Sequence, residues 1–194
     1  MKQKLLLALL LIFSMKSFSQ DSKFSLELNY PIPIDENFIG KNFNGIIDAG
    51  LKYRFVNLEV ISIGAAFNAG MYKNTKGDRV QPFDVTTYIF SPKIYAEFNM
   101  KSITKLHPSL GLGYSVINSK ADVYRFNNQN NFSVSSSEKE NGVNLNLGVA
   151  HDITNKLFAQ VQYDFIKISV DNEVPDIKYN SNINILKIGL GYRL

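Results

Sequence analysis

Short segments in which apolar and polar residues alternate recur along the chain, and this pattern restricts its fold more than any other feature. Residues 24–30, for example, read Phe-Ser-Leu-Glu-Leu-Asn-Tyr. Because successive side chains of a β-strand point to opposite faces, each segment has one apolar wall and one wall of polar or small residues. The pattern predicts eight strands, at 23–31, 45–55, 59–72, 86–99, 107–117, 142–152, 157–167 and 183–194.

The connections between these segments alternate in length. The long ones are 32–44, 73–85, 118–141 and 168–182, and the short ones are 56–58, 100–106 and 153–156. Outer-membrane barrels join an even number of antiparallel strands by long extracellular loops and short periplasmic turns. The alternation therefore predicts an all-β fold, an eight-stranded antiparallel up-and-down transmembrane β-barrel, with both ends of the barrel domain in the periplasm.

The first 20 residues have the pattern of a secretory signal peptide. Basic residues precede an apolar stretch, Leu5 to Phe13, and Ser17 and Ser19 supply the small residues of a cleavage site. We therefore expect residues 1–20 to be removed and residues 21–194 to form a barrel domain in the outer membrane. After the signal peptide, no apolar run approaches the about 18 residues of a helical membrane span.

The charge of the chain argues against nucleic acid as a partner. The signal peptide holds three of the 21 Lys and Arg residues, so that 18 remain against 17 Asp and Glu. Nucleic-acid-binding domains concentrate basic residues on one face, and a nearly neutral chain gives no such signal. The chain has no Cys and two His, so neither a disulfide framework nor a thiolate or His-rich metal site is expected. We expect no cofactor.

The C-terminal sequence, KIGLGYRL at 187–194, alternates up to its last residue. A closed barrel has no free edge, so its last strand must pair with its first, and we expect 183–194 to be the closing strand. The same stretch resembles the signal that the barrel assembly machinery reads in outer-membrane barrels. The residues that carry this likeness are Lys187, Gly189, Tyr192 and Leu194, although the usual residue at the last position is Phe.

As a whole, residues 21–194 resemble the small eight-stranded outer-membrane β-barrels, the OmpA/OmpX-like and PorT-like group. The likeness covers the mature chain and rests on the strand pattern rather than on a diagnostic motif. It implies an integral outer-membrane protein that contacts outer-membrane lipid and is inserted by the barrel assembly machinery.

An eight-stranded barrel encloses an interior that side chains can just fill. Alternation directs five acidic and five basic residues inward, which we call the lumen network: Glu27, Asp48, Glu97, Asp152 and Asp164 with Lys52, Arg54, Lys93, Lys187 and Arg193. Buried ions are tolerated when they are paired, whereas an ion-selective channel would carry one dominant sign. We therefore expect a salt-bridged, mostly plugged lumen, with a narrow porin-like pore as the alternative.

The sequence His107-Pro108-Ser109 resembles the His-x-Ser spacing of the lipid A deacylase barrels, in which a His activates a Ser nucleophile. The strand assignment places this pair inward at the periplasmic end, away from outer-leaflet lipid, so we expect a structural role and no enzyme activity. An outer-membrane lipid-modifying enzyme stays as an alternative. So does a soluble exported lipocalin-type ligand binder, whose apolar face would point inward.

The longest connection, 118–141, holds four residues that suit a contact with another protein: Tyr124, Arg125, Phe126 and Phe132. Loops of this length are usually either functional or disordered. Tyr and Arg are enriched in protein interfaces, whereas the Asn-rich and Ser-rich runs around them favour disorder. The sequence thus predicts a non-enzymatic envelope structural or surface-interaction protein that acts through its long extracellular loops. It leaves two interpretations of 118–141 open, a contact with a protein partner and a disordered loop.

Overall fold

The computed structural model describes residues 23–75, 83–100, 103–127, 130–170 and 174–194. For residues 83–84, 122–127 and 130–135 it describes the backbone only. The signal peptide expected at 1–20 lies outside the described residues. Within the described part of the chain, no helix has the length and apolar character needed to cross a membrane.

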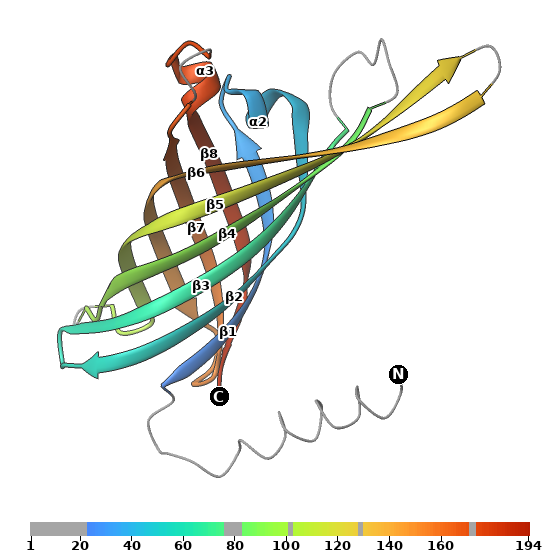
Figure 1. Ribbon diagram of the computed structural model, residues 1–194. Helices are drawn as coiled ribbons and strands as arrows, with labels where there is room; N and C mark the ends of the chain where they lie inside the picture. The colour runs from blue at the N-terminus through green and yellow to red at the C-terminus, as the bar shows by residue number, and fades with distance from the viewer. Residues whose placement is uncertain (1–22, 76–82, 101–102, 128–129, 171–173) are drawn as a thin grey trace, which may run out of the picture.

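Eight strands form one closed barrel in which each strand pairs antiparallel with the next and the last pairs with the first (Figure 1). They are β1 (Phe24–Ile34), β2 (Phe43–Asn57), β3 (Ile61–Asn74), β4 (Phe83–Phe98), β5 (Leu106–Asn127), β6 (Asn130–Asp152), β7 (Leu157–Ile168) and β8 (Asn182–Arg193). Two short helices, α2 (Phe38–Asn42) and α3 (Lys178–Ser181), precede β2 and β8. The predicted eight-stranded antiparallel barrel is confirmed, and each predicted strand has its counterpart.

The barrel closes where its first and last strands meet. β1 and β8 pair from Ser25↔Arg193 to Ile34↔Asn184, and the amide of Leu194 donates a hydrogen bond of 3.0 Å to the carbonyl of Phe24. The closing strand expected from the C-terminal alternation is therefore present. Each strand of the barrel wall has a neighbour on both sides, so the wall has no open edge.

Alternation along the strands separates an apolar outer wall from a polar interior. In β1, Leu26 and Leu28 are exposed on the outside, whereas Ser25, Glu27 and Asn29 are buried inside. The other strands add further exposed apolar residues to the outer wall, among them Leu51, Ile94, Leu112, Leu147, Ile188 and Leu190. Because a lipocalin-type barrel has the opposite arrangement, that alternative is wrong. A continuous apolar exterior of this kind suits lipid hydrocarbon rather than water.

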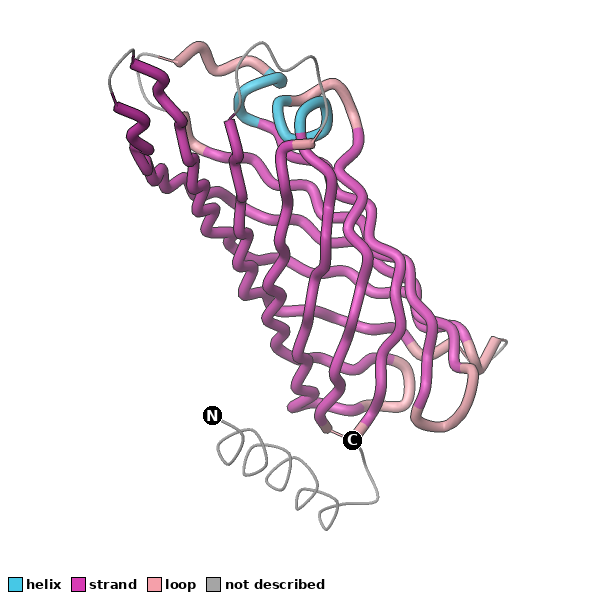
Figure 2. The backbone as a smooth tube through the Cα atoms, turned by 90° about the vertical axis from the view of Figure 1, so that its right-hand side faces the viewer, coloured by secondary structure: helices cyan, strands magenta, loops and turns pink. Residues whose placement is uncertain are grey.

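The two ends of the barrel differ (Figures 1 and 2). One end holds the start of β1, the end of β8 and the connections that follow β2, β4 and β6; we call it the turn end. The opposite end, which we call the loop end, carries α2 and α3. Outer-membrane barrels place their short turns in the periplasm and their longer connections outside the cell.

The two helices lie side by side at the loop end. Asn37 caps α2 by accepting a hydrogen bond of 2.7 Å from an amide of its first turn, and Phe38 packs edge-on against Tyr179 of α3. Asp35, which has a positive φ of 76°, turns the chain from β1 toward α2, and its carboxylate accepts a hydrogen bond of 2.9 Å from Asn184. Neither helix was predicted, because so few residues give no helical repeat in the sequence.

β5 and β6 continue beyond the barrel wall as a two-stranded hairpin, which we call the arm: residues 118–127 and 130–141. Their pairing is unbroken up to Asn127↔Asn130, and the hairpin projects to one side of the loop end in Figure 1. The prediction of a loop at 118–141 is therefore wrong. The arm is rich in Asn and Ser. It therefore lacks the alternation of apolar and polar residues by which the other strands were predicted.

A charge on the outer wall should destabilise the barrel according to its depth in the membrane. Leu112 lies near the middle of the barrel part of β5 and is 62% exposed. We expect Leu112→Arg to lower the free energy of unfolding by about 2–4 kcal/mol, because an Arg at the bilayer midplane loses its hydration. Urea unfolding of the protein in lipid vesicles, followed on unboiled gels, measures this loss.

Leu58→Arg is the matched control, because Leu58 is equally apolar and is 58% exposed at the turn end. Near the interface the cost falls to about 0–1 kcal/mol. Equal losses in the two variants would contradict the assignment of the outer wall to lipid.

Candidate functional site

The residues of the lumen network point into the barrel, and each takes part in at least one ion pair. The pairs, with their nitrogen–oxygen distances, are Lys52–Glu27 (2.5 Å), Arg54–Glu97 (2.8 Å), Lys93–Asp164 (3.5 Å), Lys187–Asp48 (2.7 Å), Lys187–Asp164 (2.8 Å) and Arg193–Asp152 (2.7 Å). Arg54 and Asp152 are half-buried, and the other members are buried. Positive and negative charges thus compensate one another inside the barrel.

Lys187 lies at the centre of the network and joins strands from both sides of the closing seam. Its ammonium contacts Asp48 of β2 and Asp164 of β7. Asp48 also accepts a hydrogen bond of 3.0 Å from Asn29, and Asp164 accepts one of 2.8 Å from Asn146. Both carboxylates therefore have a cation and a neutral donor, which is the condition under which buried ions are tolerated.

Amide side chains connect the Lys52–Glu27 pair with the ion pairs of Lys187. Gln162 donates to the Glu27 carboxylate at 3.2 Å and to the Gln160 side-chain oxygen at 2.8 Å. Gln160 in turn donates to Asn29 at 2.8 Å, which is the residue that donates to Asp48. The middle of the lumen is thus filled by polar side chains, most of which are hydrogen-bonded to one another, although the side-chain oxygens of Asn68 and Asn144 are buried without a hydrogen-bond donor.

His107 extends the network to the turn end. Its Nε2 lies 3.0 Å from a carboxylate oxygen of Asp152, and its Nδ1 lies 3.2 Å from the side-chain oxygen of Asn99. Asp152 also pairs with Arg193. The ring is held inside the barrel, so the His107–Ser109 spacing does not present a base and a nucleophile to lipid. Among the described residues, no cluster of His, Asp or Glu is placed to hold a metal ion.

A layer of apolar side chains closes the lumen toward the loop end. It is formed by buried residues of α2 and of six strands, which we call the apolar layer: Ile39, Phe43, Tyr72, Ile89, Ile117, Ile166, Ile168, Ile183 and Ile185. No member is more than 5% exposed. This layer was not predicted, because inward positions were expected to be polar along the whole barrel.

The sequence did contain a signal for the apolar layer. Ile185 and Ile183 lie two and four residues before Lys187 on the same strand, and side chains two residues apart share a face. Continuing the alternation from the inward Lys187 toward the start of β8 would have predicted that both side chains point inward. Phe43 is different, because a register shift after Gly45 reverses the phase of β2 and turns this ring inward.

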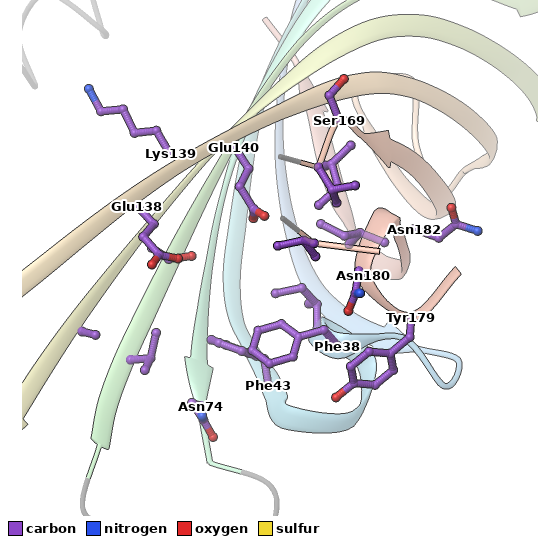
Figure 3. Close-up of a pocket in the computed structure, with 18 of the residues that line it drawn as sticks. Phe38, Phe43, Asn74, Glu138, Lys139, Glu140, Ser169, Tyr179, Asn180 and Asn182 are labelled. Atoms are coloured by element: carbon purple, nitrogen blue, oxygen red, sulfur yellow. The ribbon is translucent and has the colours of Figure 1, made fainter. Parts of the chain in front are cut away.

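Beyond the apolar layer the loop end is hollowed into a cavity of about 640 Å³, which we call the cup (Figure 3). Residues of the apolar layer, including Ile39 and Ile183, line its floor. Aromatic side chains of Phe38, Phe43 and Tyr179 lie on one side, and the β6 segment 138–140 lies on the other. The cup was not predicted, because elements far apart in the chain meet there only in the folded barrel.

The candidate contact residues of the arm lie in paired strands rather than in a loop: Tyr124, Arg125, Phe126 and Phe132. Arg125 is opposite Phe132 in the hairpin, and Tyr124 is opposite Ser133. Their side chains lie outside the described part of the chain. A contact between these residues and a partner stays a prediction.

β8 carries the residues of the predicted assembly signal. Lys187 faces the lumen, whereas Tyr192 is 43% exposed on the outer wall. Gly189 lies between them in β8, and Leu194 directly follows this strand. Since Lys187 is enclosed in the folded barrel, assembly machinery would have to bind it before closure. Recognition of this signal also stays a prediction.

Comparison with known proteins supports the architecture. Residues 5–193 match the model of a family described as the outer membrane protein β-barrel domain. None of the curated proteins matches the chain.

Several solved structures share the fold. Neisserial surface protein A of Neisseria superposes with a TM-score of 0.63 at 16% identity, over 89% of this chain and 98% of that chain. Ail of Yersinia pestis, in complex with the heparin analogue sucrose octasulfate, gives 0.56 at 14% identity, over 88% and 96%. The N-terminal β-barrel domain of OprF from Pseudomonas aeruginosa gives 0.51 at 13% identity, over 89% and 97%. At these identities the likeness concerns the fold.

Removing the central cation of the lumen network should destabilise the barrel strongly. Lys187→Met takes away the ammonium shared by Asp48 and Asp164. We expect the free energy of unfolding to fall by about 3–5 kcal/mol, because two buried carboxylates lose their partner. Urea unfolding in lipid vesicles measures the loss, and adding Asp48→Asn should restore part of it.

The matched control is Lys167→Met, because Lys167 pairs with Asp176 at 2.8 Å on the exposed surface. An exposed pair contributes about 1 kcal/mol or less. If the two single variants lost equal stability, Lys187 would not be the centre of the network.

Proposed function

Because the chain belongs to the outer membrane protein β-barrel domain family, we propose that it is a non-conducting, non-enzymatic component of the outer membrane that acts through its loop end. It is an outer-membrane protein, and its apolar outer wall suits contact with membrane lipid. By the general rule for such barrels, the turn end faces the periplasm and the loop end faces the outside of the cell.

The filled lumen is the observation that carries this proposal. An ion entering from the turn end would meet the paired charges of the lumen network and then the apolar layer. A hydrophobic constriction opposes ion passage because it sheds water. The alternative of a narrow porin-like pore has less support, because the charges inside the barrel are balanced in sign and engaged with one another.

A lipid-modifying activity also has less support than a structural role. His107 is bound to Asp152 and Asn99 inside the turn end, whereas an enzyme acting on outer-leaflet lipid needs its nucleophile and base near the loop end and facing the membrane. We therefore propose that the protein works by binding.

The arm is the element that we propose for a contact with a protein partner. Its strands are already paired, so a partner would meet a preformed ribbon rather than a loop that must be ordered on binding. Preorganisation lowers the entropy cost of association. Tyr124, Arg125, Phe126 and Phe132 are of residue types enriched at the centres of interfaces. We propose the barrel assembly machinery as a second, transient partner, bound through the end of β8.

A non-conducting barrel should give no steady current. We expect purified protein in planar lipid bilayers to leave the membrane resistance unchanged in concentrated potassium chloride, because the lumen network and the apolar layer both block the axis. Gel mobility before and after boiling shows that the barrel is folded in the same preparation. Steady channel openings from folded protein would overturn the proposal.

Shortening the arm should abolish partner binding and leave the barrel folded. Replacing residues 122–135 by Asn-Gly joins Ala121 to Ser136, which are paired across the hairpin, by a two-residue turn suited to such a connection. We expect normal insertion and a normal heat-induced gel shift. Cross-linking on intact cells should no longer recover the protein partner that the unaltered chain recovers.

A second variant separates the length of the arm from its side chains. It keeps every residue of the hairpin except the four candidate contacts, which are changed to Ser: Tyr124, Arg125, Phe126 and Phe132. Loss of the partner in both variants is expected. Unchanged recovery in both would reject the arm as a binding element.

A further inference from the structure

One wall of the cup is aromatic. The ring of Phe38 lies between the two others, with centroid distances of 5.9 Å to Phe43 and 6.1 Å to Tyr179. Phe38 is 48% exposed and Tyr179 is 37% exposed, whereas Phe43 is buried. In Figure 3 these rings stand together on the side of α2 and α3. A ligand in the cup would therefore contact apolar surface at the aromatic wall as well as at the floor.

The facing wall belongs to β6 and carries two carboxylates on its inner side. Glu140 is paired with Ile117 and Glu138 with Ser119. Ile117 is buried inside the barrel, and residues directly opposite each other in a sheet point to the same face. The inner face therefore carries Glu138 and Glu140, while the Lys139 side chain runs away from the cup in Figure 3.

Two basic residues of the described chain at the loop end pair with acidic residues that do not line the cup. Lys167 pairs with Asp176 at 2.8 Å, and Lys41 lies 3.9 Å from Glu36. Among the described residues that line the cup, Lys139 is the single basic one. The cup therefore sets an acidic wall against an aromatic wall.

We propose that the cup binds a small amphipathic cation, that is, an ammonium group carried on an aromatic or short aliphatic body. Charge complementarity favours this class, because the carboxylates of the exposed Glu138 and the half-buried Glu140 lie on one wall and attract a cation. The aromatic wall and the apolar floor take the body of the ligand, and aromatic rings also attract an ammonium. The volume of about 640 Å³ lies within the range of small-molecule sites.

This site goes beyond the proposed partner contact of the arm and can be tested apart from it. The shortened arm ends in the paired residues Ala121 and Ser136, so it keeps Glu138 and Glu140. Loss of partner binding in that variant leaves the ligand site intact. The ligand site can likewise fail while partner binding persists.

The test uses a fluorescent reporter and three probes of similar shape. The sequence has no Trp, so Tyr179→Trp places a single Trp in the cup, with Phe38→Trp as a second reporter. In lipid nanodiscs the probes are phenethylamine, 2-phenylethanol and 3-phenylpropionate. We expect saturable quenching by the amine, an affinity about tenfold lower for the neutral alcohol, and no saturable quenching by the anion. Leu112→Trp, on the outer wall, reports how far each probe enters the lipid.

Glu138→Gln then tests the acidic wall in the reporter protein. It should weaken phenethylamine binding by about three- to tenfold and leave 2-phenylethanol binding unchanged. The matched control is Glu59→Gln at the turn end, which should change neither. Equal affinity for amine and alcohol, no saturation by the amine, or unchanged amine affinity in correctly inserted Glu138→Gln protein would each overturn the proposal. If Glu138→Gln does not insert, the three-probe comparison on the reporter protein decides.

Discussion

In the hydrocarbon of a membrane no water reaches the peptide groups, so every backbone amide and carbonyl must find its partner within the protein. The chain meets this requirement by pairing β8 with β1. Closure has a second consequence, because it shuts the inner side chains into a narrow space where polar groups must satisfy one another. The lumen network, in which each charged residue has an ion partner, thus takes the place that an apolar core has in a soluble domain.

The same constraint decides how much of the molecule could be predicted from its sequence. Lipid requires an apolar residue at every second position of a spanning strand, and this rule sufficed to find eight strands, the seam and the inward direction of residues such as Asp48 and Asp164. The rule does not act outside the membrane. The arm has polar residues on both strands and was predicted as a loop, while α2 and α3 are too short to leave a pattern. The cup, which is built from these elements, could not be found for the same reason.

The lumen network and the apolar layer follow from one inner face that changes character along the barrel. On β8 the inward residues pass from Lys187 to Ile185 and Ile183 within two steps of the strand repeat. Toward the loop end the lumen network is followed by the apolar layer, and the cup begins where the apolar layer ends. Four residues of the apolar layer therefore also line the proposed ligand site: Ile39, Phe43, Ile168 and Ile183. In this barrel, one set of apolar side chains covers the paired charges of the lumen and also shapes the surface of the cup.

The seam gains its strength from side chains as well as from backbone pairing. Lys187 of β8 contacts Asp48 of β2 and Asp164 of β7, and Glu27 of β1 binds Lys52 of β2 while accepting from Gln162 of β7. These contacts brace the junction of β8 and β1 from both sides. In an open sheet the edges of β1 and β8 would lack backbone partners, and Lys187 would lack Asp48. Pairing of β8 with β1 completes the backbone hydrogen bonds and the ion pairs across the seam together, so each set stabilises the other. Closure is therefore a cooperative step. Lys187 takes part in this step whether or not assembly machinery has bound it beforehand.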